Sequence, residues 1–318
     1  MKVDETITGL ERSSAMKRNL ALVLGGGGGR GALQVGALRA LFEAGLYPDM
    51  LVGTSAGAVN AAYLGMRGVN LAGVEALEKA WLVAAGLNLF PSNFLWLTVR
   101  TLFNRPTPVV ANRMQEFFLS QGLSPEMRFG DIPGVRVYLV AADLNSGKTV
   151  VYGRDPQESL MEGLLASTAL PPWVSPIAKP DQLLIDGGAV STLPIEPALS
   201  QGATEIIALD LQDNRMIPTE AQGFGPFMAR VINTVENRQK ELELALAEAY
   251  GVRVRLVHLE GPEPTPLWDF TRSAELIECG YRQMWEVMDS WPADHRPPWL
   301  AWLSHMLQRK SRPPRGMR

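Results

Sequence analysis

The sequence has little cysteine and little histidine. Cys279 is the only cysteine among 318 residues, which excludes an intrachain disulfide framework and a metal site built from several thiolates of this chain. This usage suits a reducing compartment, and we expect a cytoplasmic protein. The three histidines, His258, His295 and His305, all lie toward the C-terminal end. A catalytic triad that requires histidine therefore has few candidates.

Charge of one sign and long apolar runs are also lacking. The formal net charge is -3, so the chain has no global positive field for a nucleic-acid backbone, and nucleic acid is not an expected partner. No run reaches the roughly 20 apolar residues of a membrane-spanning helix. Residues 1–19 alternate acidic, basic and polar groups without the apolar core of a secretory signal. We expect a soluble or membrane-surface protein.

What the chain does contain is apolar sequence in short segments, with 46% hydrophobic residues overall. Residues 20–24 read as a buried strand that stops at the glycine-rich loop 25–31, and a helix follows as far as Gly45. Residues 50–53 predict a second strand, with a turn at residues 54 and 55 and a helix over 56–66. Two successive strand-turn-helix units predict parallel strands in an α/β fold.

Further elements are expected along the rest of the chain. Strands are predicted over 135–141, 148–152, 183–185, 206–210 and 252–259, and helices over 195–201, 227–249 and 273–290. Residues 145–147 form the turn of a hairpin, and residues 171–180 and 211–226 are read as loops. We divide the chain into a flexible segment (1–19), a catalytic core (20–211), a C-terminal part of the same domain (212–290) and a tail (291–318).

A five-residue motif marks the candidate nucleophile. In Gly53-Thr54-Ser55-Ala56-Gly57 the serine lies between a strand and a helix, where a sharp turn exposes its hydroxyl. Glycines two residues to either side relieve crowding in such a turn. The N-terminal amides of the following helix point at the same place. The structural alternative is a tight turn with a serine N-cap.

The glycine-rich loop admits two interpretations. Gly26, Gly28 and Gly31 follow the G-x-G-x-x-G pattern of dinucleotide-binding loops, but Asp49 precedes the second strand instead of ending it, where the ribose-binding acid belongs. The other interpretation is an oxyanion hole made by the amides of Gly26, Gly27, Gly28 and Gly29. A P-loop is excluded at residues 147–149, because Ala142 replaces the leading glycine and a strand follows.

The candidate base is Asp186, which begins Asp186-Gly187-Gly188 directly after the strand at 183–185. Assuming a parallel sheet, we expect this carboxylate at the same sheet edge as Ser55. It could then take the serine proton directly, if partial desolvation raised its basicity. The alternatives are a plain Asp-Gly-Gly turn and a triad that uses His258, at the end of a strand.

Together the three motifs resemble those of the patatin-like phospholipases, as does the stretch Ala166-Ser167-Thr168-Ala169-Leu170-Pro171-Pro172. The resemblance covers about residues 20–210. It implies a three-layer α/β fold with a mainly parallel sheet, a dyad of Ser55 and Asp186 without histidine, and no metal or cofactor. It further implies that Gly26–Gly29 form the oxyanion hole, and that lipid acyl esters are the substrates. The residues that support the motifs are Arg30, Gly31, Gly53, Gly57, Gly187 and Gly188.

Two apolar segments suggest contact with lipid. The tail carries Trp299, Trp302 and neighbouring aliphatic residues, followed by five basic residues between Arg309 and Arg318. It could dock peripherally on an anionic bilayer, or be a packed helix with a solvated basic end. The aromatic segment between Phe90 and Phe103 could cover the acyl site, although core packing is the commoner fate of such residues. A lipid-binding module without turnover, and a dinucleotide-dependent enzyme, remain as alternatives.

Overall fold

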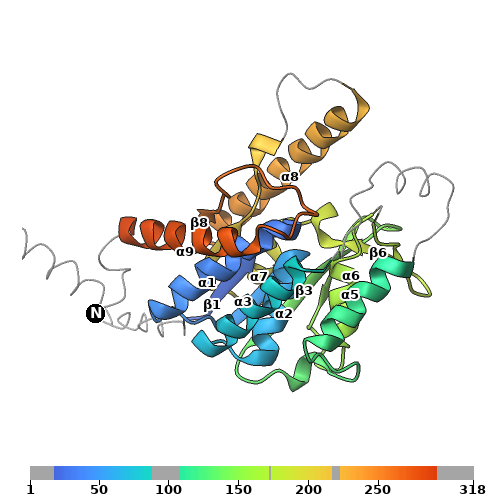
Figure 1. Ribbon diagram of the computed structural model, residues 1–318, viewed down its shortest axis with the longest axis horizontal. Helices are drawn as coiled ribbons and strands as arrows, with labels where there is room; N and C mark the ends of the chain where they lie inside the picture. Colours follow the sequence, from blue (N-terminus) through green and yellow to red (C-terminus); the bar gives the residue numbers. More distant parts are fainter. Residues whose placement is uncertain (1–17, 88–107, 172, 217–222, 292–318) are drawn as a thin grey trace, which may run out of the picture.

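The computed structural model describes residues 18–87, 108–171, 173–216 and 223–291 (Figure 1). Most of the predicted N-terminal segment, the aromatic segment between Phe90 and Phe103, and the tail beyond Trp291 lie outside the described residues. The last two residues of the predicted N-terminal segment, Arg18 and Asn19, are described and contact the rest of the fold. Arg18 forms an ion pair with Glu205, and the Asn19 amide group donates to the carbonyl of Gly202.

The strands form one sheet of eight, in the order β5-β6-β3-β2-β1-β7-β8, with β4 paired to β3. Neighbours are parallel from β3 through β2, β1 and β7 to β8, whereas β4, β5 and β6 join by antiparallel pairing. The strands are β1 (Leu20–Leu24), β2 (Met50–Thr54), β3 (Arg136–Asp143), β4 (Lys148–Tyr152), β5 (Ile177–Ala178), β6 (Leu183–Asp186), β7 (Glu205–Asp210) and β8 (Arg253–His258). The continuous burial of β1 and β2 explains why they read as unbroken apolar runs.

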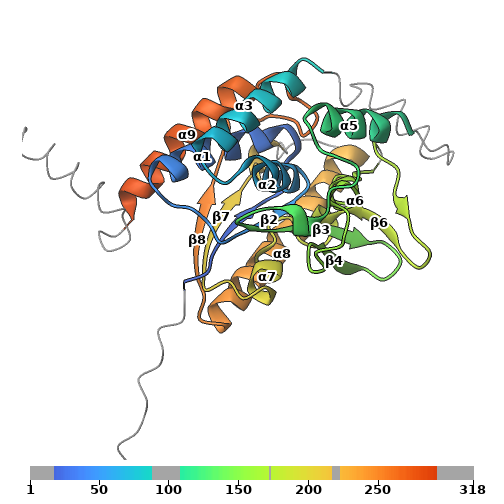
Figure 2. The ribbon, with the colours of Figure 1, turned by 90° about the horizontal axis from the view of Figure 1, so that it is seen from below.

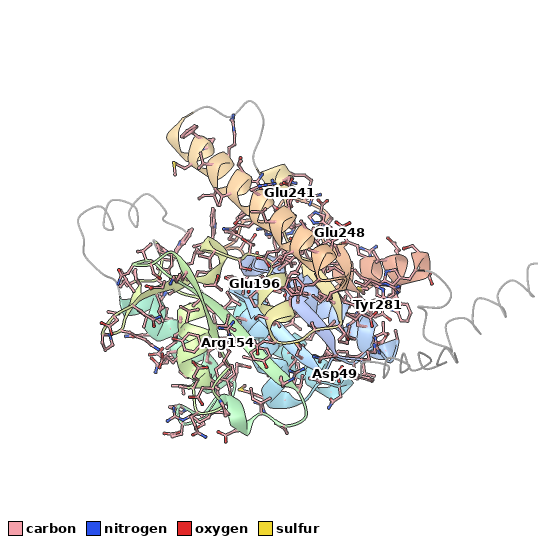
Figure 3. The ribbon with its side chains drawn as sticks, turned by 180° about the vertical axis from the view of Figure 1, so that it is seen from behind. Asp49, Arg154, Glu196, Glu241, Glu248 and Tyr281 are labelled. Carbon is pink, nitrogen blue, oxygen red and sulfur yellow. The ribbon has the colours of Figure 1, made fainter. Side chains whose placement is uncertain are left out.

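Helices cover both faces of this sheet (Figure 2). One face carries α1 (Gly31–Glu43), α2 (Ala56–Arg67), α3 (Leu71–Ala85), α5 (Pro108–Ser120), α6 (Leu160–Ser167) and α9 (Ser273–Ser290). The other carries α7 (Ile195–Ser200) and α8 (Phe224–Ala249). Seen from behind, α8, which bears Glu241 and Glu248, lies next to α7 with Glu196 (Figure 3). This confirms the expected three-layer fold with a mainly parallel sheet.

Most predicted elements occur close to their expected bounds. The strand at 20–24 and the helix at 273–290 match residue for residue, and the hairpin of β3 and β4 is present. Two predicted loops contain regular structure, because β5 lies within 171–180 and α8 begins at Phe224. Helices α3, α5 and α6 were not predicted.

One topological expectation is wrong. The strand before Asp186 is antiparallel to its neighbour β3, with Ala141 opposite Asp186 and Asp143 opposite Leu184. β6 therefore begins at the edge where β3 ends and runs inward. An apolar run of four residues carries no information on its direction, so the sequence could not reveal this.

The C-terminal part of the chain is built into the same layers. β8 extends the sheet beside β7, and α9 packs against α1. The two helices approach closely where Gly36 faces the backbone of Ile277 and Gly280 faces the backbone of Leu33. No helix in the described ranges is long and apolar enough to cross a bilayer.

Candidate active site

Ser55 occupies a strained turn between β2 and α2. Its φ is 54° and its ψ is -121°, and among the described residues it is the only non-glycine residue with positive φ. Such a conformation is costly for a residue with a Cβ and is typical of functional turns. A Cβ on Gly53 would lie 2.3 Å from the Gly57 carbonyl oxygen, and one on Gly57 would lie 2.0 Å from that of Leu24. The two motif glycines are therefore required by space.

Ser167, the last residue of α6, holds this turn against the neighbouring strand β3. The Ser55 backbone N–H donates to the Ser167 hydroxyl at 3.0 Å, and that hydroxyl donates to the Val140 carbonyl at 2.6 Å. Ser167 is fully buried at the end of α6. It thereby connects the strained peptide of Ser55 to β3. The sequence motif around Ser167 was noticed, but this role was not predicted.

Asp186 meets the serine end to end on one side of β3, instead of at a shared parallel edge. Thr54 pairs with Val140 and Asp186 pairs with Ala141, and both pairings lie on the same side of β3, because β4 occupies the other side along residues 139–143. Strands β2 and β6 therefore run toward each other, and their facing ends place Ser55 and Asp186 in the wall of the same cavity. The chain then turns under β3 at Gly187, where a Cβ would lie 2.3 Å from the Val140 carbonyl oxygen.

The Asp186 carboxyl is buried and only half satisfied. Asp186 is only 4% exposed to solvent, and its Oδ1 accepts the Gly188 N–H at 2.8 Å. Burial raises the pKa of Asp186 to about 6, although the nearby Ser55 hydroxyl and the Gly188 amide both oppose the rise. The serine contact falls short of ordinary hydrogen-bond geometry, because Oδ2 is buried without a partner. An unpartnered carboxylate oxygen beside a serine hydroxyl is placed to accept its proton.

The glycine-rich loop presents two free amides. The Gly26 N–H donates to the Thr192 carbonyl at 2.9 Å and the Gly29 N–H to the Leu267 carbonyl at 2.7 Å. For Gly27 and Gly28, the described part of the chain supplies no acceptor within hydrogen-bond distance of the N–H. Of the four predicted donors, Gly27 and Gly28 are therefore the two whose amides are not already committed to the fold.

Buried polar side chains fix this loop from behind. Gln34 donates to the carbonyls of Gly25 and Leu209 at 2.9 and 3.1 Å. Asn60 donates to the Gly31 carbonyl and the Gln34 side chain, and accepts the Trp81 indole N–H at 2.8 Å. These contacts link the loop to α1, α2 and α3 without any exposed group.

Arg30 also braces the loop, but through a carbonyl. Its Nε donates to the Gly27 carbonyl at 3.3 Å, and within the described ranges no carboxylate lies at ion-pair distance from it. Burial lowers its pKa, and the charges of Asp213 and Glu236 oppose that change. Arg30 therefore contacts the loop through a main-chain carbonyl and not through a carboxylate pair.

An apolar pocket opens from the serine into the helical layer, with about 1030 Å³ of empty space when the part open to solvent is counted. Ser55 and Asp186 lie in its wall, and aliphatic and aromatic side chains make up most of the rest. The helical lining consists of Ala56, Val59, Tyr63 and Met66 from α2, Leu77, Ala80, Trp81 and Ala84 from α3, and Met114, Phe117 and Phe118 from α5. A pocket of this apolar character suits a hydrophobic ligand.

The segment between β8 and α9 contributes a further wall that sequence reasoning missed. Leu267, Trp268 and Phe270 line the pocket, and the rings of Phe270 and Trp81 stack with centroids 5.6 Å apart. The backbone of Leu267 lies very close to Gly28, because a Cβ added to Gly28 would be 2.1 Å from the Leu267 carbonyl oxygen. No short-range pattern could have shown this, because the contacts join opposite ends of the described chain.

Neither His258, the candidate for a triad, nor Asp49, the candidate acid of a nucleotide site, lies where that site would need it. His258 ends β8, at the far edge of the sheet, where its Nδ1 lies 3.2 Å from Asp210 and its Nε2 lies 2.8 Å from Glu260. The hydrogen bond to Asp210 raises its pKa. Asp49, the acid that a nucleotide site would need, accepts the Leu20 N–H at the start of β1. It therefore lies at the opposite end of the strand from the glycine-rich loop.

Comparison with known proteins gives a family and several relatives. A family model described as patatin-like phospholipase matches residues 22–199. The chain is 28% identical to mouse patatin-like phospholipase domain-containing protein 7 over 297 residues, which is 86% of this chain and 21% of that protein. It is 25% identical to an uncharacterized NTE family protein of Mycobacterium tuberculosis, over 76% of this chain and 40% of that protein.

Among solved structures, VipD from Legionella pneumophila is similar with a TM-score of 0.45 and 15% identity, covering 86% of this chain and 67% of that one. The chain spans at most 40% of the length of the two curated relatives above.

Proposed function

Because the chain belongs to the patatin-like phospholipase family, we propose that it is a serine acyl hydrolase that cleaves lipid esters with a Ser55–Asp186 dyad. One observation carries this proposal. The buried Asp186 carboxyl has an unpartnered oxygen beside the strained Ser55, in the wall of an apolar pocket.

The proposed reaction has two halves. Asp186 takes the hydroxyl proton of Ser55 while the serine oxygen bonds to the ester carbonyl carbon, and the Gly27 and Gly28 amides stabilise the resulting oxyanion. The protonated Asp186 then gives its proton to the leaving alcohol as the ester bond breaks. Water, deprotonated by Asp186, attacks the acyl-enzyme, and the proton returns to Ser55 as the fatty acid leaves. Each step uses only the chain's own groups and water.

Labelling with a fluorophosphonate probe tests the activated serine directly. We expect the protein to be labelled and to hydrolyse p-nitrophenyl and phospholipid esters, and Ser55→Ala to lose both properties. His258→Ala is the control for a triad, and it should keep most of its activity because His258 is bound between two carboxylates. A folded protein that resists labelling would instead support a lipid-binding module without turnover.

Peripheral membrane contact through the tail is a separate proposal, supported by its aromatic residues and five basic side chains. Deleting residues 292–318 should reduce sedimentation with vesicles that contain anionic lipid. Equal sedimentation of both proteins would contradict it.

A further inference from the structure

The pocket extends along one side of α2. Its lining residues on that helix recur at a spacing of three or four, as Ala56, Val59, Tyr63 and Met66, so they share one face. Met66 lies eleven residues beyond Ser55, which is about 16 Å along an α-helix. The pocket therefore has a long axis that starts at the nucleophile.

A second helix accompanies α2 along the same axis. Met114, Phe117, Phe118 and Gln121 line the pocket with the spacing of one face of α5 and its end. The ends of the two helices meet away from the serine, where the Arg67 guanidinium donates to the main-chain carbonyl of Gln121. Met66 and Gln121 thus mark the end of the pocket opposite the catalytic pair.

Between these two ends the lining offers hydrocarbon. The Tyr63 hydroxyl donates to the Ala76 carbonyl at 3.2 Å and the Thr168 hydroxyl to the Leu164 carbonyl at 2.7 Å. Both lining hydroxyls are therefore occupied within the protein. These two side chains therefore have no free hydroxyl proton to offer a polar headgroup, whereas a linear alkyl chain needs no hydrogen bond.

We propose that this pocket measures acyl-chain length, with Val59, Tyr63 and Met66 as specificity-determining residues. The ester carbonyl lies at Ser55 and the methyl end of the chain lies at Met66 and Gln121. An extended chain advances roughly 1.25 Å per methylene, given C–C bonds of about 1.5 Å, so the path holds on the order of a dozen carbons. The inference rests on the proposed acyl hydrolase function and names its substrate as a long-chain acyl ester.

The test is to block the path at two depths. Val59→Phe places a ring four residues, or about 6 Å, beyond the serine, and Met66→Phe places one near the far end. Hydrolysis is measured for p-nitrophenyl esters from acetyl to palmitoyl. We expect the ratio of palmitoyl to butyryl kcat/KM to fall at least ~10-fold in both variants, with a cutoff at shorter chains in Val59→Phe than in Met66→Phe.

Matched variants separate blocking from disturbance. Val59→Ala and Met66→Leu change the same positions without filling the pocket, and should hydrolyse palmitoyl esters without the chain-length cutoff of the phenylalanine variants. Leu82→Phe adds a ring on α3 at an exposed residue that does not line the pocket, and should leave the profile unchanged. Equal loss for all chain lengths, or identical cutoffs in the two phenylalanine variants, would overturn the proposal.

Binding distinguishes failure of the proposed pocket from failure of the proposed activity. Displacement of a fluorescent fatty acid from the Ser55→Ala protein by butyrate, decanoate and palmitate needs no turnover. Graded loss of long-chain binding in the two phenylalanine variants would support the measuring pocket even if no ester were hydrolysed. Unaltered palmitate binding in both would refute it even in an active esterase. If Val59→Phe fails to fold, Met66→Phe, judged by its melting curve, carries the test alone.

Discussion

Ser55 and Asp186 are both held in states that oppose folding. Ser55 has a positive φ, which costs on the order of 1–3 kcal/mol for a residue with a side chain. Asp186 is ionised only at the expense of its hydration, as its raised pKa shows. In the proposed reaction, the same two features would supply the nucleophile and a base stronger than an ordinary carboxylate. The two proposed catalytic residues therefore lower the free energy of unfolding.

Asp186→Asn should therefore separate activity from stability. The amide cannot take the serine proton, so we expect kcat to fall by ~10² to 10⁴. Above pH 7 the variant should be more stable by roughly 1–3 kcal/mol, because a shift of about two pKa units is worth up to ~3 kcal/mol. Urea unfolding at pH 8 and ester hydrolysis measure the two effects. A variant that loses stability at pH 8 would contradict the desolvation argument.

The pH dependence of kcat/KM should report the same carboxyl. Asp186 must be ionised to act as base, so activity should rise as pH increases and level off above its pKa of about 6. His258→Ala should give the same profile. A profile that moved in this variant would show that the histidine, and not the aspartate, titrates in the reaction.

Ser167 acts on the nucleophile through its backbone. Ser167→Ala removes the acceptor of the Ser55 N–H, and leaving a buried donor unpaired costs ~1–3 kcal/mol. We expect the rate of fluorophosphonate labelling and kcat to fall while KM changes little, because the pocket stays intact. Ser167→Thr restores a hydroxyl and should recover part of the rate. Equal labelling rates in Ser167→Ala and wild type would rule out this positioning role.

At the scale of elements, the sequence pattern predicted those strands and helices whose formation depends mainly on neighbouring residues. The strand at 20–24 and the helix at 273–290 have clear apolar or helical periodicity and definite ends. The direction of β6 depends on its pairing with β3, which no run of four residues encodes. For the same reason the sequence identified Ser55 and Asp186 as a pair but assigned the wrong geometry to their meeting. The pocket wall formed by residues 267–270 depends on contacts with residues far away in the sequence, and it carries no motif, so it could not be predicted.

The glycine-rich loop can be tested as a unit at Gly28. Its φ is 55° and its Cα faces the Leu267 carbonyl, so Gly28→Ala should displace the loop, lower stability and reduce kcat. Gly45→Ala is the matched control. Gly45 also has a positive φ, of 73°, but open space around it, so it should cost only ~1–2 kcal/mol of backbone strain. Thermal melts and labelling rates compare the two. Full activity in Gly28→Ala would show that the loop geometry is not required.

At the scale of the whole molecule, buried acids should make stability fall as pH rises from about 4 toward neutrality. Burial raises the pKa of Glu243 to about 7, even though it accepts hydrogen bonds from the Ser191 hydroxyl and the Glu196 amide. A carboxyl whose pKa is higher in the folded state binds more protons there, so stability decreases between its unfolded and folded pKa values. For Asp186 and Glu243 this window runs from about pH 4 to pH 7.

Glu243→Gln should flatten this curve. The isosteric amide keeps an acceptor for Ser191 or Glu196 but cannot ionise, so its stabilising effect should be larger at pH 8 than at pH 5. The raised pKa of His258 contributes stability that is present below its unfolded pKa of about 6.5 and is lost as pH rises through the higher folded value. Guanidinium unfolding at pH 5, 6.5 and 8 measures the slope. Parallel curves for the variant and wild type would show that Glu243 does not titrate there.

The bond between the Gly29 amide and the Leu267 carbonyl has a consequence for synthesis of the protein. Chains emerge from the ribosome N-terminal end first, so Ser55, Asp186 and the glycine-rich loop are all translated well before the segment that secures the loop. A nascent chain that has already folded its sheet would still lack one wall of the pocket and the support behind Gly28. The proposed catalytic site would then become complete only after residues 267–270 have left the ribosome.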